Sequence, residues 1–267
     1  GFSLYNTSFE GYATHTFLNG IVMFLTISGA LGFIVVTDIW YYFSKKSNSI
    51  SFTTKMITLS FFGVLLIATA ITFFGESTIQ HYPVFERLEI ATFQTVNAIS
   101  TAVYNSIPLS NLTLGVLLTI IFLMYVGAAP SSTGGGMKIT TLTAVIAIVK
   151  SKVRNQAKVT YLGKKIPADR LEMAVSTFIF YTAILFFSVF LLSFTENQSL
   201  EKLLFEATSA IGTVGLSMGI TGSLSVWGKI ILISIMFIGR VGVITFGLAI
   251  LAKKQHKKID NETDLAV

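Results

Sequence analysis

Long apolar runs separated by short polar segments dominate the chain. Five such runs cover residues 14–43, 54–74, 112–149, 172–194 and 226–252. A run of about twenty uncharged residues is long enough to cross a bilayer as a helix. We therefore expect an all-α polytopic membrane protein whose third span is interrupted.

Two shorter apolar stretches, 88–99 and 200–211, each precede a segment rich in Thr, Ser, Gly and Asn. A helix of about 12 residues is roughly 18 Å long and reaches only about halfway through the hydrocarbon core. Non-helical backbone at that depth must be buried in protein or line a watery cavity. The partly negative C-terminal end of the half-helix favours a cation there. The pattern predicts helix–pore loop–helix units of a cation pore.

The chain also matches itself after a shift of 112 positions, and the matched spans share one orientation. The identities are Phe93 with Phe205, Ala98 with Ala210, Ile99 with Ile211 and Thr101 with Thr213. A repeat that coincides with the alternation of spans indicates internal duplication. We predict these units: 1–50, the end of a second pore repeat; 51–150, a third repeat; 151–171, a basic connection; 172–258, a fourth repeat; and 259–267, a tail.

Charge placement sets the predicted topology. Only 12% of the 267 residues are charged, with a net charge of +6. The basic residues gather in three clusters: Lys45, Lys46 and Lys55; Lys150, Lys152, Arg154, Lys158, Lys164, Lys165 and Arg170; and Lys253, Lys254, Lys257 and Lys258. The positive-inside rule makes these connections cytoplasmic. Their alternation with apolar spans favours topology over a nucleic-acid surface, so no nucleic-acid partner is expected.

Catalytic chemistry has little support in the sequence. There is no cysteine, and His15 and His81 have no second ligand at metal spacing. No acid–base pair or activated nucleophile is evident, so we expect a non-enzyme without a cofactor.

Four stretches resemble the Trk/Ktr/HKT potassium transporters, most closely the bacterial Ktr/Trk branch. They are "GFSLYNTSFEGY" at the start, "PSSTGGGMKITTL" at 130–142, "FEATSAIGTVGLSMGIT" at 205–221 and "MFIGRVGVITF" at 236–246. The resemblance implies parallel helix–pore loop–helix repeats of a potassium-channel-like pore. It also implies K⁺ uptake across the plasma membrane, with K⁺ held by backbone carbonyls.

The resemblance also implies the filter residues. One quarter of the filter would be Thr213, Val214, Gly215 and Leu216; another would be Thr101, Ala102, Val103 and Tyr104; and Gly1 would remain from a third. Val103 departs from the family pattern, which has glycine at this position. A β-branched residue is strained at positive φ. Either this quarter follows a different backbone path, or selectivity for K⁺ over Na⁺ is weaker. A misalignment by one position is the remaining alternative.

The glycine run inside the third span predicts a break in the helix. Each glycine costs about 1 kcal/mol relative to alanine in a helix. The run does not fit a phosphate-binding loop, because Ile139 follows Lys138 where Ser or Thr is required. The resemblance implies an intramembrane gate formed by Ser132, Thr133, Gly134, Gly135, Gly136, Lys138 and Arg240. We expect Arg240 to pair with loop carbonyls. A passive kink and a purely structural arginine are the alternatives.

K⁺ uptake is the leading functional hypothesis, with Na⁺ as a possible second ion. The alternatives are a secondary cation-coupled carrier with a midplane site, a class that often uses inverted repeats, and a non-transporting membrane scaffold. The resemblance implies a homodimer in membrane lipid on a cytoplasmic ring of nucleotide-binding regulatory subunits. Two repeats and a remnant do not close a four-quarter filter, so we expect the chain to be a C-terminal fragment.

Overall fold

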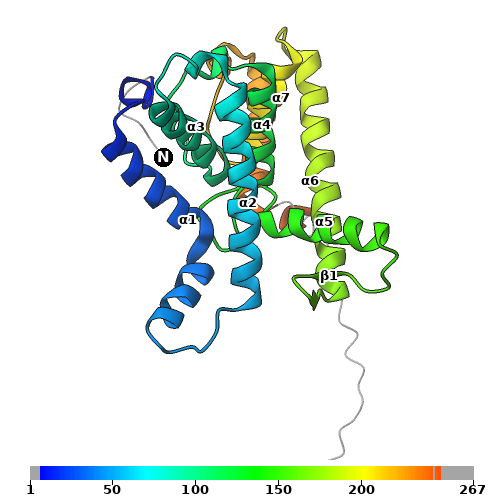
Figure 1. Ribbon diagram of the computed structural model, residues 1–267. Coiled ribbons are helices and arrows are strands. Elements are labelled where there is room, and N and C mark those ends of the chain that lie inside the picture. The colour runs from blue at the N-terminus through cyan, green and yellow to red at the C-terminus, as the bar shows by residue number, and fades with distance from the viewer. Residues whose placement is uncertain (1–6, 243, 248–267) are drawn as a thin grey trace, which may run out of the picture.

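The computed structural model describes residues 7–242 and 244–247 and is almost entirely helical (Figure 1). The helices are α1 (Thr16–Phe43), α2 (Phe52–Gly75), α3 (Val84–Ser100), α4 (Leu114–Val126), α5 (Ile139–Val153), α6 (Ala168–Thr195), α7 (Leu200–Ile211) and α8 (Val226–Val241). Single 3₁₀ turns lie at Glu10–Tyr12, Ser77–Ile79, Leu109–Asn111 and Thr221–Ser223. A short hairpin pairs β1 (Thr160–Tyr161) with β2 (Lys164–Lys165).

The helices follow the predicted repeat. A long helix (α2 or α6) leads to a shorter one (α3 or α7), then a non-helical segment, then a returning helix (α4 or α8). Figure 1 shows α2 and α6 running in the same direction, so the two repeats are parallel. This confirms the predicted fold class. The parallel arrangement differs from the inverted repeats that many secondary carriers use.

Three of the described helices, α1, α2 and α6, are long and apolar enough to cross a membrane. The third predicted span is interrupted as expected, with α4 and α5 on either side. The fifth span differs from the prediction of one helix over 226–252, because α8 ends at Val241. Gly242 follows with φ +94°, which is outside the helical region. The half-helix α7 matches its predicted bounds, whereas α3 begins earlier, at Val84.

The core has two main parts, one around each repeat. The first includes Phe61, Phe93 and Leu123 from α2, α3 and α4, and it also takes in Phe205 of α7. The second includes side chains of α6, α7 and α8 together with Met137, which directly follows the glycine run. Repeat four therefore contributes Phe205, Val214 and Leu216 to the first core, and repeat three contributes Met137 to the second. These shared contacts hold the two half-helices in fixed relation.

A matched carboxylate joins the outer and returning helices of each repeat. Glu76, which caps the C-terminus of α2, accepts hydrogen bonds from the Thr113 backbone N–H (2.9 Å) and hydroxyl (3.1 Å) at the N-cap of α4. Glu196, which caps α6, does the same for Ser225 at the N-cap of α8. A carboxylate near a helix N-terminus satisfies unpaired N–H groups there. Each repeat is thus closed by a helix-end clasp.

The hairpin lies at the same end of the molecule as the connection between α1 and α2 (Figure 1). The Tyr161 hydroxyl lies 3.0 Å from the Ser60 hydroxyl of α2, and Thr143 of α5 donates to Ser60 at 2.9 Å. The Thr160 N–H of β1 also donates to the Ser151 hydroxyl of α5 at 3.4 Å, so the hairpin contacts both α2 and α5. Figure 1 shows α5 running crosswise between α2 and α6.

The contacts of Glu76 predict that its replacement by glutamine destabilises the protein. In Glu76→Gln the amide nitrogen must replace one oxygen, yet one oxygen faces the Thr78 N–H (3.1 Å) and the other the Thr113 N–H (2.9 Å). Either orientation puts two donors face to face in a fully buried site. We expect a loss of about 2 kcal/mol of stability, measured as a lower thermal unfolding midpoint in detergent. The matched control is Glu172→Gln, an exposed glutamate of α6; equal midpoints for the two variants would contradict the clasp.

Candidate functional site

The two segments predicted to form filter strands have the same unusual backbone. Thr101 and Val103 have φ +60° and +73°, and their counterparts after the shift of 112, Thr213 and Gly215, have φ +51° and +87°. The hydrogen bonds correspond as well. The Ala102 N–H donates to the Asn97 carbonyl (3.1 Å), and the Val214 N–H donates to the Ser209 carbonyl (2.8 Å).

Val103 therefore takes the glycine-like conformation despite its β-branched side chain. Of the alternatives for Val103, a different backbone path is not what the structure contains. Such a conformation costs of order 1–3 kcal/mol and persists only where the surroundings enforce it. A Cβ on Gly215 would lie 3.1 Å from both γ carbons of Val103, so the two segments face each other at these positions. Gly1, the third predicted filter position, lies outside the described residues.

The glycine-rich segment between α4 and α5 is a folded-back loop held by its own backbone. The Ala128 N–H donates to the Gly135 carbonyl (3.2 Å), and the Lys138 N–H donates to the Val126 carbonyl (2.9 Å). The two strands of the loop approach so closely that a Cβ on Gly136 would lie 2.5 Å from the Gly127 Cα. Only glycine fits this crossing.

A kink in α1 holds the other side of the loop. Gly32 has φ +77° inside the helix, and a Cβ there would lie 2.8 Å from the Ser131 carbonyl. The carbonyls freed near the kink accept loop N–H groups, from Ala129 to Ala30 (3.0 Å) and from Thr133 to Gly29 (3.2 Å). Sequence reasoning missed this contribution. The glycines at 29 and 32, within an otherwise apolar span, were the signal that could have found it.

The loop lies directly against both filter segments. The Gly135 N–H donates to the Thr101 hydroxyl at 3.1 Å. A Cβ on Gly135 would overlap the Gly212 carbonyl and the Thr213 hydroxyl, and one on Gly134 would lie 2.9 Å from the Ser100 carbonyl. The structure thus brings the predicted gate glycines into contact with the starts of both predicted filter segments.

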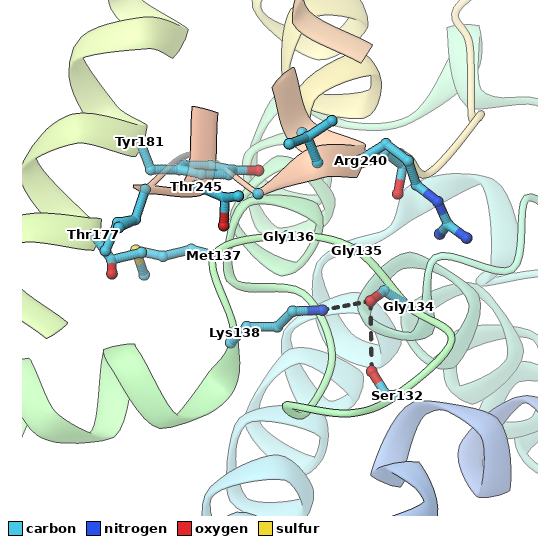
Figure 2. A pocket seen from close by; sticks show the side chains of 15 residues that line it. Ser132, Gly134, Gly135, Gly136, Met137, Lys138, Thr177, Tyr181, Arg240 and Thr245 are labelled. Carbon is cyan, nitrogen blue, oxygen red and sulfur yellow. Dashed lines mark hydrogen bonds between the residues drawn. The ribbon is translucent and has the colours of Figure 1, made fainter. Parts of the chain in front are cut away.

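Two cavities border the loop. One of about 420 Å³ lies between α1, the loop residue Thr133 and the predicted filter segment of repeat three, where Thr101, Ala102 and Tyr104 line it. The other, of about 510 Å³, lies between the loop, α6 and the end of α8 (Figure 2). Its lining includes Ser132, Gly134, Gly135, Gly136, Lys138, Thr213 and Arg240. The loop therefore borders two spaces, each of which is lined by a predicted filter threonine, Thr101 or Thr213.

The polar contact to the loop carbonyl comes from Lys138 and not from Arg240. The Lys138 ammonium donates to the Gly134 carbonyl at 2.6 Å, and Figure 2 shows this bond within the cavity. Arg240 lines the same cavity, but within residues 7–242 and 244–247 it makes no hydrogen bond to the loop. The expected pairing of Arg240 with loop carbonyls is therefore not what the structure contains. Gly239 beside it packs α8 against the end of α7, where a Cβ would overlap the Ile211 carbonyl.

Comparison with known proteins agrees with this geometry. A model of the family described as "TrkH: Cation transport protein" matches residues 1–261. The chain is 31% identical to Ktr system potassium uptake protein B of Bacillus subtilis over 97% of this chain and 58% of that protein. It is 34% identical to the potassium/sodium uptake protein NtpJ of Enterococcus hirae over 95% of this chain and 57% of that protein. The chain thus spans a little over half the length of these relatives.

A solved structure shares the fold. The crystal structure of the potassium transporter TrkH from Vibrio parahaemolyticus superposes with a TM-score of 0.78 at 19% identity, covering 94% of this chain and 55% of that one. With the family model covering nearly the whole sequence, the chain belongs to the TrkH family of cation transport proteins.

Proposed function

We propose that this protein carries K⁺ into the cell through a filter of backbone carbonyls that includes Thr101–Tyr104 and Thr213–Leu216. The observation that carries the proposal is that the glycine loop packs directly against both matched filter segments, at Thr101 in repeat three and at Thr213 in repeat four. Extended backbone with inward carbonyls can replace the hydration shell of a cation. Na⁺ is a second candidate ion, because Val103 stands where its counterpart is glycine and one relative is named as a potassium/sodium uptake protein.

The loop around Gly134–Gly136 acts as the gate in this proposal. It fills the space next to both filter threonines, and its glycines permit the large φ and ψ changes that opening requires. Lys138 holds the loop through the Gly134 carbonyl and places a positive charge in the cavity, which opposes a passing cation. Arg240 adds a second positive charge to the same cavity.

The surroundings of the pore are also part of the proposal. We place the protein in the plasma membrane as a homodimer, with its basic connections in the cytoplasm. The hairpin with Lys164 and Lys165 lies at the same end as the connection with Lys45 and Lys46, which agrees with that orientation (Figure 1). A cytoplasmic ring of nucleotide-binding subunits would dock at this end. The units 1–50, 51–150, 151–171, 172–258 and 259–267 remain the proposed division of the chain.

The central experiment is Rb⁺ uptake from the complete gene in a bacterium that lacks its own K⁺ uptake systems. Gly215→Ser should weaken uptake at least several-fold or admit Na⁺, because Gly215 has φ +87° and its Cβ would press on Val103. The control is Gly222→Ser, where a Cβ meets nothing within 4 Å. Absence of uptake by the unmodified protein, or equal uptake by both variants, would refute the proposed filter.

A second prediction concerns the gate. Gly135→Ala should displace the loop from Thr213 and raise the initial rate of Rb⁺ uptake several-fold, and deletion of Gly134–Gly136 should do the same. Gly63→Ala, which adds a methyl group to α2 in open space, should leave the rate unchanged. If the rate stays at the unmodified level in both loop variants, the loop is a passive kink.

A third prediction concerns ion preference. Val103→Gly removes both the strained conformation and the methyl groups that face Gly215. We expect the ratio of Rb⁺ to Na⁺ uptake to rise several-fold. Val103→Ala separates the two causes, because alanine removes the γ carbons but is still strained at positive φ. An unchanged ratio in both variants would show that Val103 does not set ion preference.

A further inference from the structure

One buried carboxylate behind the filter has no part in the gate or in the helix-end clasps. Glu206 lies in the middle of α7 with only 5% of its surface exposed. Its Oε1 accepts hydrogen bonds from the Ser217 hydroxyl and from the Met218 N–H (3.0 Å), and its Oε2 accepts one from the Thr221 hydroxyl (2.8 Å). All three donors belong to the segment that directly follows the filter residues Thr213–Leu216. Glu206 therefore fixes the far end of the repeat-four filter strand.

The matching position in repeat three is neutral. A shift of 112 places Gln94 of α3 at the position of Glu206, and the Gln94 Oε1 accepts the Ser106 N–H (3.3 Å) as Glu206 accepts that of Met218. The backbone contact is thus shared, and only the charge differs.

Among the described residues, hydroxyl donors to the side chain at this position are present only in the repeat that has the charged residue, repeat four. Repeat four supplies Ser217 and Thr221 to the carboxylate, whereas the corresponding residues of repeat three are Asn105 and Leu109. Asn105 instead donates to Glu10 at 2.8 Å, and Leu109 has no polar group. Repeat four is therefore built to hold a carboxylate where repeat three holds an amide.

The Glu206 charge has no fixed cationic partner in the described part of the chain. The salt bridge found there joins Arg170 to Asp169 at 3.8 Å, far from α7 in sequence and on an exposed surface. Three hydrogen bonds stabilise a buried carboxylate but do not neutralise it, and an uncompensated buried charge is costly. The adjacent filter strand, whose carbonyls attract cations, is where a compensating positive charge would reside.

We infer that Glu206 determines the cation affinity of the filter, with the transported ion itself serving as its counter-charge. This inference rests on the proposed K⁺ transport. The carboxylate acts through space on an ion in the repeat-four side of the filter, and the neutral Gln94 leaves the repeat-three side without an equivalent attraction. At an effective dielectric constant of about 20, a unit charge about 10 Å from the ion changes its binding about tenfold.

The test is Glu206→Gln in the full-length protein. The amide keeps an oxygen for Ser217 and Met218, and its NH₂ group can donate to the Thr221 hydroxyl, so the three contacts survive and only the charge is lost. We expect KM for Rb⁺ uptake to rise about tenfold while Vmax stays within about twofold. The K⁺ concentration that half-maximally raises the thermal unfolding midpoint of the purified protein should rise by the same factor.

Two further variants sharpen the result. Glu201→Gln removes an equal charge from the exposed first turn of the same helix and should leave KM unchanged. Glu206→Ala removes all three acceptors and should lower the unfolding midpoint in the absence of K⁺, whereas Glu206→Gln should not.

Each outcome bears on the inference. An unchanged KM in Glu206→Gln beside normal uptake by the unmodified protein overturns the inference and leaves the proposed function intact. An unfolding midpoint without K⁺ that is as low for Glu206→Gln as for Glu206→Ala assigns a structural role and also overturns it. If the unmodified protein neither takes up Rb⁺ nor is stabilised by K⁺, the proposed function fails and this inference fails with it.

Discussion

The requirement that every backbone polar group in the membrane interior find a partner governs this structure. The helices satisfy it by their own geometry, but the filter segments and the glycine loop do not. Their N–H and carbonyl groups pair with one another, with the kink of α1 and with the Thr101 hydroxyl. The kink at Gly32 and the loop therefore form one unit, because the carbonyls freed in α1 are those that accept the loop N–H groups.

The two repeats share most of their structural features and differ in one region. The clasps at Glu76 and Glu196 and the positive φ angles at the filter are common to both repeats. The returning helix differs most. In repeat four α8 ends at Val241, whereas in repeat three a whole loop is inserted between α4 and α5. In the proposed function, the elements common to both repeats form the pore wall, and the inserted loop of repeat three is the part that obstructs it.

The sequence was sufficient for the architecture because hydrophobic runs and charge placement are local signals, and the shift of 112 is a regular repeat that the sequence shows directly. The break at the glycine run was predictable for the same reason, and α7 was placed to the residue. The end of α8 was missed because one glycine in an apolar run rarely ends a membrane helix. The clasp at Glu76 was also missed. It joins residues 37 positions apart in the chain, and no periodic pattern marks such a pair.

The partners of the two basic side chains at the gate were harder to predict. Arg240 was expected to hold the loop because an intramembrane arginine needs a partner, yet Lys138 takes the Gly134 carbonyl. Lys138 lies four residues from Gly134 on the same folded loop. Its ammonium group therefore reaches the Gly134 carbonyl whatever the position of α8, which carries Arg240. Composition identifies which residues are polar, but the fold of the loop decides which of them meet.

The crossing of Gly127 and Gly136 limits which substitutions the proposed gate can accept. At these positions and at Gly135 any side chain collides with backbone, so substitution there replaces the loop conformation instead of adjusting it. Gradual change in the ease of opening would come from side chains that contact the loop backbone, such as Lys138 and Ser132 within the loop and Thr101 beside it. If the loop is the gate that we propose, its ease of opening can be adjusted at its edges, whereas the glycines at its centre tolerate no side chain.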